Sequence, residues 1–120
     1  MENLRIFAVH LEKSTLIVAP TGPISNLAGQ DVQPELEQVM ALVQKGSCRD
    51  VLVDMEKVSF FGSVLLGALS VIWRQTHQRE GKLALCGLSS LGLEIIHATK
   101  FDTLWEIYPT REEALKALAR

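Results

Sequence analysis

DMEKVSFFGSVLLG, residues 54–67, is the stretch that decides the fold, because it joins a predicted buried strand to a predicted apolar helix. The overlapping run VLVDM, residues 51–55, is short, branched and apolar, which is typical of a strand covered on both faces. Leu52 and Val53 are therefore expected to be inaccessible to solvent. The helix is expected to begin at Ser63 and to run to about Arg79.

Ser63 stands where this helix would need its N-terminal cap, and its hydroxyl has two candidate roles. The hydroxyl can accept a hydrogen bond from a free amide of the first helical turn. Alternatively, it can be an exposed acceptor for a phosphoryl group, which the same amides and the helix dipole would stabilise. The spacing by itself favours the cap.

The segment from Val58 to Gly67 resembles the signature of the STAS domain family, the bacterial anti-sigma factor antagonists, which reads roughly V-x-F-[ILM]-D-S-S-G-L-G. The positions that agree are Val58, Phe60, Ser63, Leu66 and Gly67. The positions that depart are Gly62, Val64 and Leu65, which replace the acid, the second serine and the first glycine of the motif. The resemblance implies that Ser63 is the phosphorylated serine, in a segment that has lost part of its polar character.

The stretch PTGPISNL, residues 20–27, is expected to contain a surface loop, since two prolines and a glycine cannot continue a hydrogen-bonded strand. The STAS family carries a G-x-[LI]-D-like turn at this place, beside the phosphoserine loop. Gly22 and Ile24 match that turn, whereas Ser25 replaces the family acid. The resemblance thus implies a partner-binding surface made by two loops, with the residues Gly22, Ser25, Asn26, Phe61, Gly62, Ser63, Val64, Leu66 and Gly67.

Strand and helix patterns alternate along the rest of the chain. Strands are expected at 4–11, 15–19, 82–86 and 104–107, and helices at 30–45, at 89–99 and after Thr110, which should cap the last helix. Gly46 should end the first helix, and Gly81 should close the central helix in the left-handed conformation. This order predicts a single α/β domain over residues 1–120, with a mixed, mostly parallel sheet of about five strands and about four helices. The STAS resemblance covers nearly the whole chain and implies the same fold.

The central helix is more apolar than one sheet face requires. Its apolar residues cover an arc of roughly 220°, against about 100° for a helix that packs on a single core. The middle of the arc, expected in the core, holds Leu65, Ala68, Leu69 and Ile72, and its two edges hold Leu66 with Trp73 and Val64 with Val71. Either neighbouring helices or a docked partner must cover these edges.

Composition argues against several classes of function. A net charge of −2 with scattered Lys and Arg residues provides no basic patch for nucleic acid. No apolar run approaches ~18 residues and the N-terminus does not fit a secretory signal, so we expect a cytoplasmic protein without membrane insertion. Cys48 and Cys86 are expected to be reduced and buried, and His10, His77 and His97 fall on separate elements. We therefore expect neither a metal site nor a cofactor.

Three functions compete. The resemblance implies a regulatory protein that binds a serine kinase or anti-sigma factor in a partner-switching pathway. Phosphorylation of Ser63 would switch this protein by adding about −1.5 to −2 charges. The alternative is a non-phosphorylated accessory subunit of a membrane transport or signalling assembly, which uses the apolar residues 64–66 as its contact. Catalysis is disfavoured because no nucleophile elbow, phosphate loop or local acid pair is present, although Ser63 and His97 could be neighbours. The partner's identity and the oligomeric state stay open.

Overall fold

The main sheet has five strands in the part of the chain that the computed structural model describes, residues 7–20, 26–27, 33–46, 48–58 and 60–119. The strands are β1 (Phe7–Glu12), β2 (Thr15–Pro20), β4 (Asp50–Asp54), β6 (Leu83–Cys86) and β7 (Glu106–Tyr108), in the order β1-β2-β4-β6-β7. β1 and β2 form an antiparallel hairpin, and the other neighbours are parallel. The helices are α1 (Gln33–Gln44), α2 (Ser63–Gln78), α3 (Ser90–Thr99) and α4 (Arg111–Leu118). The predicted fold class is confirmed.

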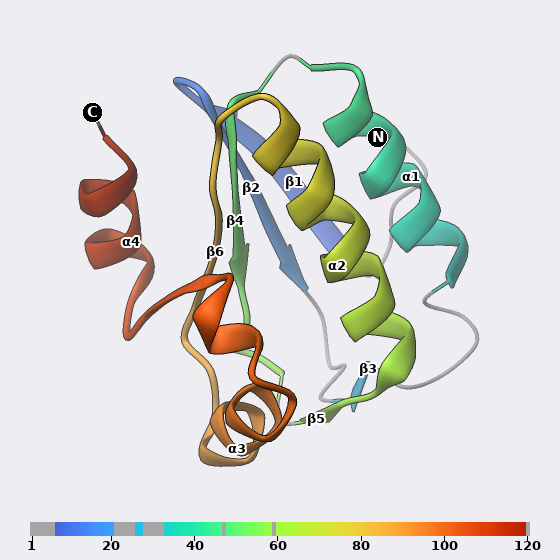
Figure 1. Cartoon of the computed structure of the whole chain (residues 1–120), viewed down its shortest axis with the longest axis vertical. Coiled ribbons are helices and arrows are strands. Elements are labelled where there is room, and N and C mark those ends of the chain that lie inside the picture. The colour runs from blue at the N-terminus through green and yellow to red at the C-terminus, as the bar shows by residue number, and fades with distance from the viewer. Residues whose placement is uncertain (1–6, 21–25, 28–32, 47, 59, 120) are drawn as a thin grey trace.

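Helices cover the two faces of this sheet unequally (Figure 1). α1 and α2 lie side by side on one face, α4 lies on the other, and α3 lies beyond the end toward which the parallel strands run. Successive side chains of β4 alternate between the two cores: Val51 and Val53 pack with α1 and α2, whereas Leu52 packs with Ala114 and Leu118 of α4. Leu52 and Val53 are 0% and 2% exposed, as the apolar run predicts.

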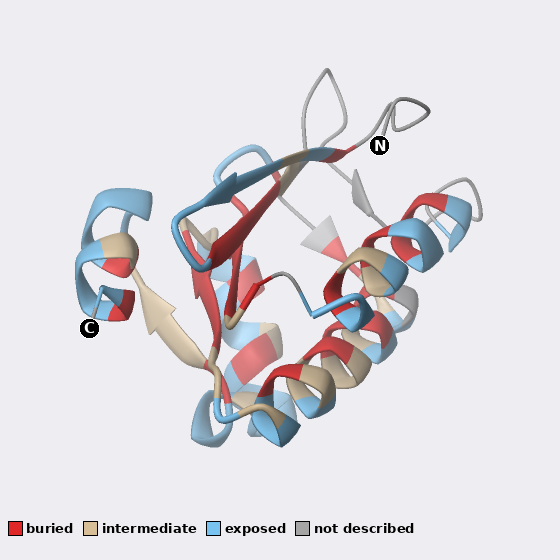
Figure 2. Cartoon of the chain, turned by 90° about the horizontal axis from the view of Figure 1, so that it is seen from above, coloured by how far each residue is buried: buried red, intermediate tan, exposed pale blue. Residues whose placement is uncertain are grey.

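α2 is buried through the middle of its apolar arc, and its buried residues face the sheet and α1 (Figure 2). The four residues predicted to be core are all buried: Leu65, Ala68, Leu69 and Ile72. Leu66 and Trp73, at one edge of the arc, are half-buried and pack against the same core. Neighbouring elements of the chain therefore supply much of the cover that this helix needs.

Two predicted details at the ends of elements need correction. Gly46 does end α1 with φ +80°, but at the end of α2 the left-handed residue is Glu80, with φ 62°. Gly81 serves another purpose, since a Cβ atom there would lie 1.8 Å from the carbonyl oxygen of Arg49. The last strand was predicted at 104–107 but is β7, because the 3-10 helix η2 (Phe101–Thr103) precedes it and the amides of Leu104 and Trp105 donate back to the carbonyl of Phe101 at 2.9 and 2.8 Å.

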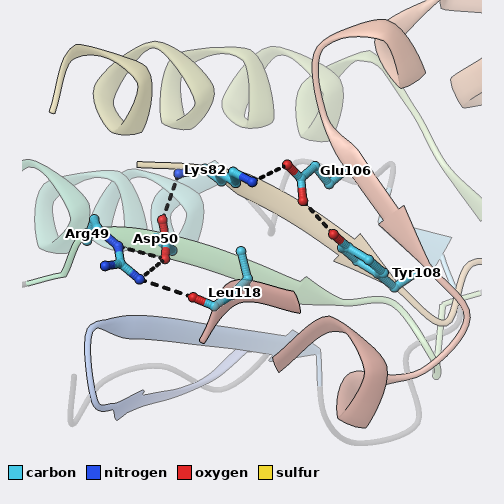
Figure 3. A network of polar contacts seen from close by, with 6 residues as sticks. All are labelled: Arg49, Asp50, Lys82, Glu106, Tyr108 and Leu118. Carbon is cyan, nitrogen blue, oxygen red and sulfur yellow. Dashed lines mark hydrogen bonds and ion pairs between the residues drawn. The ribbon is translucent and has the colours of Figure 1, made fainter. Parts of the chain in front are cut away.

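Polar contacts tie together the strand ends farthest from α3 (Figure 3). Asp50 is fully buried at the start of β4, where it accepts hydrogen bonds from the Arg49 side chain at 2.8 Å and from the Lys82 amide at 2.8 Å. Arg49 also donates to the carbonyl of Leu118 at 3.1 Å, and the Lys82 ammonium lies 3.0 Å from Glu106. One connected set of contacts thus fixes β4, β6, β7 and the end of α4.

Replacing Leu69 with Ala is expected to lower the free energy of unfolding by about 2–5 kcal/mol, as the same truncation does at other fully buried leucines. Leu69 is 1% exposed, so its truncation leaves a cavity under α2. Leu104→Ala is the matched control, because Leu104 is 48% exposed and its loss should change stability by less than about 0.5 kcal/mol. Urea unfolding of both variants measures the difference, and similar losses in the two would contradict the core assignment.

Two weak acids should make the fold less stable at high pH. Burial, aided by Asp54, raises the pKa of the Cys86 thiol from 9.0 to about 12. A hydrogen bond to Glu106, aided by burial, raises the pKa of Tyr108 from 10.0 to about 12. The folded state favours the protonated forms, so their stabilisation is complete below pH 9.0 and disappears as the pH rises toward 12.

Urea unfolding between about pH 8 and about pH 11 measures this loss, because the range starts below 9.0, the ordinary pKa of the thiol, and rises toward its folded value of about 12. The wild type should keep its stability up to about pH 9 and lose it progressively above that value. A Cys86→Ala, Tyr108→Phe double variant should decline less steeply, since neither new side chain titrates. Equal slopes for the two proteins would contradict the assignment.

Candidate functional site

The two loops predicted to form the site are held together by a small second sheet that the sequence analysis missed. Its strands are β3 (Asn26–Leu27) and β5 (Phe60–Phe61), which pair in parallel with Asn26 opposite Phe60. β5 leads into α2 within two residues, so the pairing fixes the backbone of Asn26 beside the segment that carries Ser63 (Figure 1). The predicted neighbourhood of the two loops is thus present in the part of the chain that is described.

Ser63 is the first residue of α2, and the prediction that it caps this helix is wrong. Gly62 occupies the cap position, with an extended backbone at φ −119° and ψ −161°, and its carbonyl accepts the first helical hydrogen bond from the Leu66 amide at 3.2 Å. Glycine offers no side-chain cap, and the first turn contains no acidic residue. Ser63 is exposed, and its hydroxyl has no hydrogen-bond partner among the described residues. The hydroxyl is therefore accessible at a helix end that favours negative charge.

Substitutions at Ser63 should change stability differently from substitutions at a residue that caps a helix. Ser63→Ala is expected to change the free energy of unfolding by less than about 0.5 kcal/mol, because no hydrogen bond is lost. Ser63→Asp is expected to raise it by about 0.3–1 kcal/mol, because an acid in the first turn interacts favourably with the helix dipole.

Urea unfolding measures these changes in stability, and Thr110 supplies the matched control. Its hydroxyl accepts a hydrogen bond from the Glu113 amide at 3.1 Å and caps α4, as predicted from sequence. Thr110→Ala should therefore cost about 0.5–2 kcal/mol. A loss of the same size in Ser63→Ala would restore the cap as the role of Ser63.

Phe61 supports the site from within the core and is not part of its surface. Its side chain is 2% exposed, which corrects its expected place in the partner contact. The Phe61 ring packs against α3 at Gly92, where a Cβ atom would lie 3.3 Å from the ring and 3.2 Å from Leu88. The Gly92 amide in turn donates to Ser89, the cap of α3, at 3.0 Å. The segment before Ser63 is thus anchored to the start of α3.

Beside Ser63 lies a hollow of about 300 Å³ between α1 and α2, lined by Gln33, Leu36, Met40, Ser63, Gly67, Ala68 and Val71. Gly67 stands one turn after Ser63, so the two residues share a helix face. Gly67 is exposed, and a Cβ atom there would meet nothing within 4 Å. A glycine inside a helix costs about 0.5–1 kcal/mol relative to alanine. Packing therefore does not require a glycine at position 67. The missing side chain leaves the surface beside Ser63 uncovered.

The apolar residues after Ser63 do not form one exposed contact. Leu65 is 1% exposed and belongs to the core, and Leu66 is half-buried against it. The surface expected for an accessory subunit at 64–66 is therefore smaller than predicted. Gly62 is also half-buried. The remaining predicted contact residues, Gly22 and Ser25, lie outside the described residues, as does the side chain of Val64.

His97 and Ser63 line different hollows and share no contact among those described. The Nδ1 atom of His97 lies 2.7 Å from the Asp102 carboxylate. Within the described ranges, no group of three or more His, Cys, Asp or Glu side chains is arranged to hold a metal ion. Cys48 and Cys86 are both buried and free, as predicted. The described helices are all too short or too polar to cross a membrane.

Asp54 is the residue near the site that the sequence analysis did not single out. It is the last residue of β4, is 9% exposed and accepts hydrogen bonds from the Glu56 amide at 3.0 Å and from Arg111 at 2.8 Å. These contacts tie the turn that precedes β5 to the start of α4. An acid at the end of a buried strand was the available signal, but its partner Arg111 is 57 residues away in the sequence.

Comparison with known proteins adds a family to this geometry. A family model described as the STAS domain matches residues 7–114. BtrV of Bordetella bronchiseptica, which carries the name of an anti-sigma factor antagonist, is 26% identical over 102 residues, covering 85% of this chain and 84% of the relative. An anti-sigma-factor antagonist (STAS) domain protein from Planctomyces limnophilus is 29% identical with a TM-score of 0.87, covering 95% of this chain and 98% of that chain.

SpoIIAA, an anti-sigma factor antagonist and Bacillus cell fate determinant, has a similar fold in two solved states. Its unphosphorylated form is 18% identical with a TM-score of 0.78, covering 92% of this chain and 94% of that one. Its phosphorylated form is 17% identical with a TM-score of 0.73, covering 92% and 97%. The resemblance that began from residues 58–67 is confirmed by the family match over 7–114, and this chain belongs to the STAS domain family.

Proposed function

We propose that this chain is a regulatory protein of the anti-sigma factor antagonist type, which binds a serine kinase or anti-sigma factor through the surface around Ser63. The names of BtrV and of the Planctomyces limnophilus protein support the class. The observation that carries the proposal is the exposed Ser63 hydroxyl, which has no structural role as a cap. A serine kept accessible at this place is suited to modification.

Phosphorylation of Ser63 is the switch in this proposal. A phosphoryl group there would lie at the N-terminus of α2, where free amides and the helix dipole stabilise an anion. No acid in the first turn opposes the added charge, since Gly62 stands where the STAS motif has an acid. The fold should therefore tolerate the modification, and its effect should fall on the bound partner.

The partner should be sensitive to that charge because the neighbouring surface is neutral. None of the residues that line the hollow between α1 and α2 is charged. A partner that fits this surface loses water from it on binding, and about −1.5 to −2 charges at its rim would then be poorly solvated in the complex. Phosphorylation should thus favour the free protein.

Gly67→Ala should separate folding from binding. The new methyl group has open space and improves helix propensity, so the free energy of unfolding should rise by about 0.5–1 kcal/mol. Partner affinity should fall, because the methyl group projects beside Ser63. Gln78→Ala, at an exposed position at the other end of α2, is the control and should leave affinity unchanged. Unaltered binding by Gly67→Ala would place the partner elsewhere.

Ser63→Asp tests the switch itself. The partner is first isolated on the wild-type protein from the native host, and its affinity is then measured for each variant. Ser63→Ala should bind as the wild type does, whereas Ser63→Asp should bind at least about tenfold more weakly, a change of about 1.4 kcal/mol. Incubation with the partner and ATP should add one phosphoryl group to the wild type and none to Ser63→Ala, as read by intact mass.

Ser90→Asp is the matched control for this experiment. Ser90 is also an exposed serine at the first position of a helix, so the substitution adds the same charge at the equivalent helix position; the two helix ends differ in that Ser89 caps α3, whereas no side chain caps α2. It should fold normally and bind the partner as the wild type does. Equal affinity of Ser63→Asp and the wild type would reject phosphorylation at Ser63 as the switch.

A further inference from the structure

A second hollow lies away from Ser63, between α3 and β7. Its volume is about 520 Å³, within the range of pockets that hold small ligands. Residues of α3 line one side of it, and the chain from Asp102 to Ile107 lines the other. None of the lining residues belongs to the surface assigned to Ser63, so this hollow is separate from the proposed partner site.

The charged side chains that line this hollow already have partners. The Asp102 carboxylate lies 2.7 Å from the Nδ1 atom of His97. The Glu106 carboxylate lies 3.0 Å from the Lys82 ammonium and accepts a hydrogen bond from the Tyr108 hydroxyl (Figure 3). A charged ligand would have to compete with these contacts, whereas a neutral ligand leaves them intact. The hollow is therefore suited to a neutral ligand.

The Trp105 indole is the polar group of this lining that has no partner among the described residues. Trp105 is 2% exposed, and its Nε1 atom is buried without an acceptor. The Phe101 ring stacks on the Trp105 ring with centroids 4.3 Å apart, which holds the indole in place. The neighbouring Thr103 hydroxyl, by contrast, donates to the Lys100 carbonyl at 2.7 Å. A buried donor without an acceptor is costly, so the indole favours a ligand that brings an oxygen acceptor.

The rest of the hollow is apolar and partly uncovered. Leu93 and Leu104 line it and are 37% and 48% exposed, and Ile96 and Ile107 continue the apolar surface inward. A ligand chain that covers these side chains gains by removing apolar area from water. Access to the indole nitrogen requires a neighbouring side chain to move, and exposed side chains change rotamer rapidly. The lining thus combines an apolar surface with one buried donor.

We propose that this hollow binds a small neutral molecule with an apolar chain and a carbonyl group, of the class of the alkyl ketones. The carbonyl oxygen accepts the hydrogen bond from the Trp105 indole, and the chain covers Leu93 and Leu104. An ammonium group has no acceptor to offer the indole. A carboxylate has acceptors, but it would approach Asp102 and Glu106 without any Lys or Arg in the lining. The neutral carbonyl fits both the paired acids and the unpaired donor.

Two probes of similar chain length test this proposal by NMR. The full-length protein is titrated at pH 7 with 2-octanone, which has one acceptor oxygen, and separately with n-octylamine, which is protonated and has none. Octanone should give saturable shifts at α3 and β7 and move the Trp105 indole proton downfield as its hydrogen bond forms. The indole of Trp73, which is outside the lining, is the internal control. The Kd of octanone should be at least about fivefold below that of octylamine. Saturation by octanone without a downfield change at Trp105, or equal affinity for the two probes, would overturn the proposal.

A sulfur analogue of tryptophan tests the hydrogen bond without changing the shape of the side chain. In a Trp73→Phe variant, Trp105 is the remaining tryptophan, and growth on benzothienylalanine replaces its N–H with sulfur. Compared with the same variant that contains tryptophan, the analogue should bind octanone about fivefold more weakly, because the donor is lost. Unchanged affinity would exclude the indole as the donor and overturn the proposal.

Two leucine variants test the apolar part of the site and do not depend on the analogue. Leu104→Ser should weaken octanone binding about fivefold while preserving the fold, because Leu104 lines the hollow and is 48% exposed. Leu91→Ser is the matched control, since Leu91 is 45% exposed on α3 but is outside the lining. It should leave the affinity unchanged. Equal effects of the two substitutions would place the ligand elsewhere and overturn the site.

Discussion

Burial of β4 on both faces is the constraint on which the rest of this structure depends. The strand cannot remain in water on either side, so α1 and α2 must cover one face and α4 must cover part of the other. The two ends of β4 have different roles. The buried Asp50 at its start is satisfied by Arg49 and the Lys82 amide, and Asp54 at its end directs the chain toward β5 and Ser63. The position of the site follows from where this strand stops.

Two glycines at the start of α2 show that the fold and the site have different requirements. Gly62 leaves the helix without a side-chain cap, and Gly67 weakens the helix without relieving any close contact. Gly81, at the other end of the same helix, is different, since the carbonyl of Arg49 leaves no room for a larger residue. Gly81, after the end of α2, is needed for close packing against Arg49, whereas Gly62 and Gly67 keep the surface around Ser63 accessible.

The sequence predicted the layers well because apolar spacing alone determines them. The run at 51–55 and the arc of Leu65, Ala68, Leu69 and Ile72 were both confirmed. Local boundaries were harder, since a serine next to a glycine does not reveal which of the two caps the helix, and Ser63 was misassigned by one position. The β3–β5 pairing and the Asp54–Arg111 contact depend on segments far apart in the chain, whose approach no local pattern reports. Assignment of Ser63 to a phosphorylated role came from family resemblance and not from periodicity.

The attachment of the Ser63 segment through β3 and β5 has a consequence for how such a protein can evolve. Each of these strands is two residues long, and together they form a sheet separate from the five-stranded one. Phe61 of β5 belongs to the core, whereas Gly62 is half-buried and Ser63 and Gly67 are exposed, so substitutions at these three positions can change the site while the two cores around β4 stay the same. Among the departures from the family motif, Gly62 lies directly after β5, outside the core, whereas Leu65 is buried in the core. A lineage can thus acquire a new binding specificity here without first having to acquire a more stable fold.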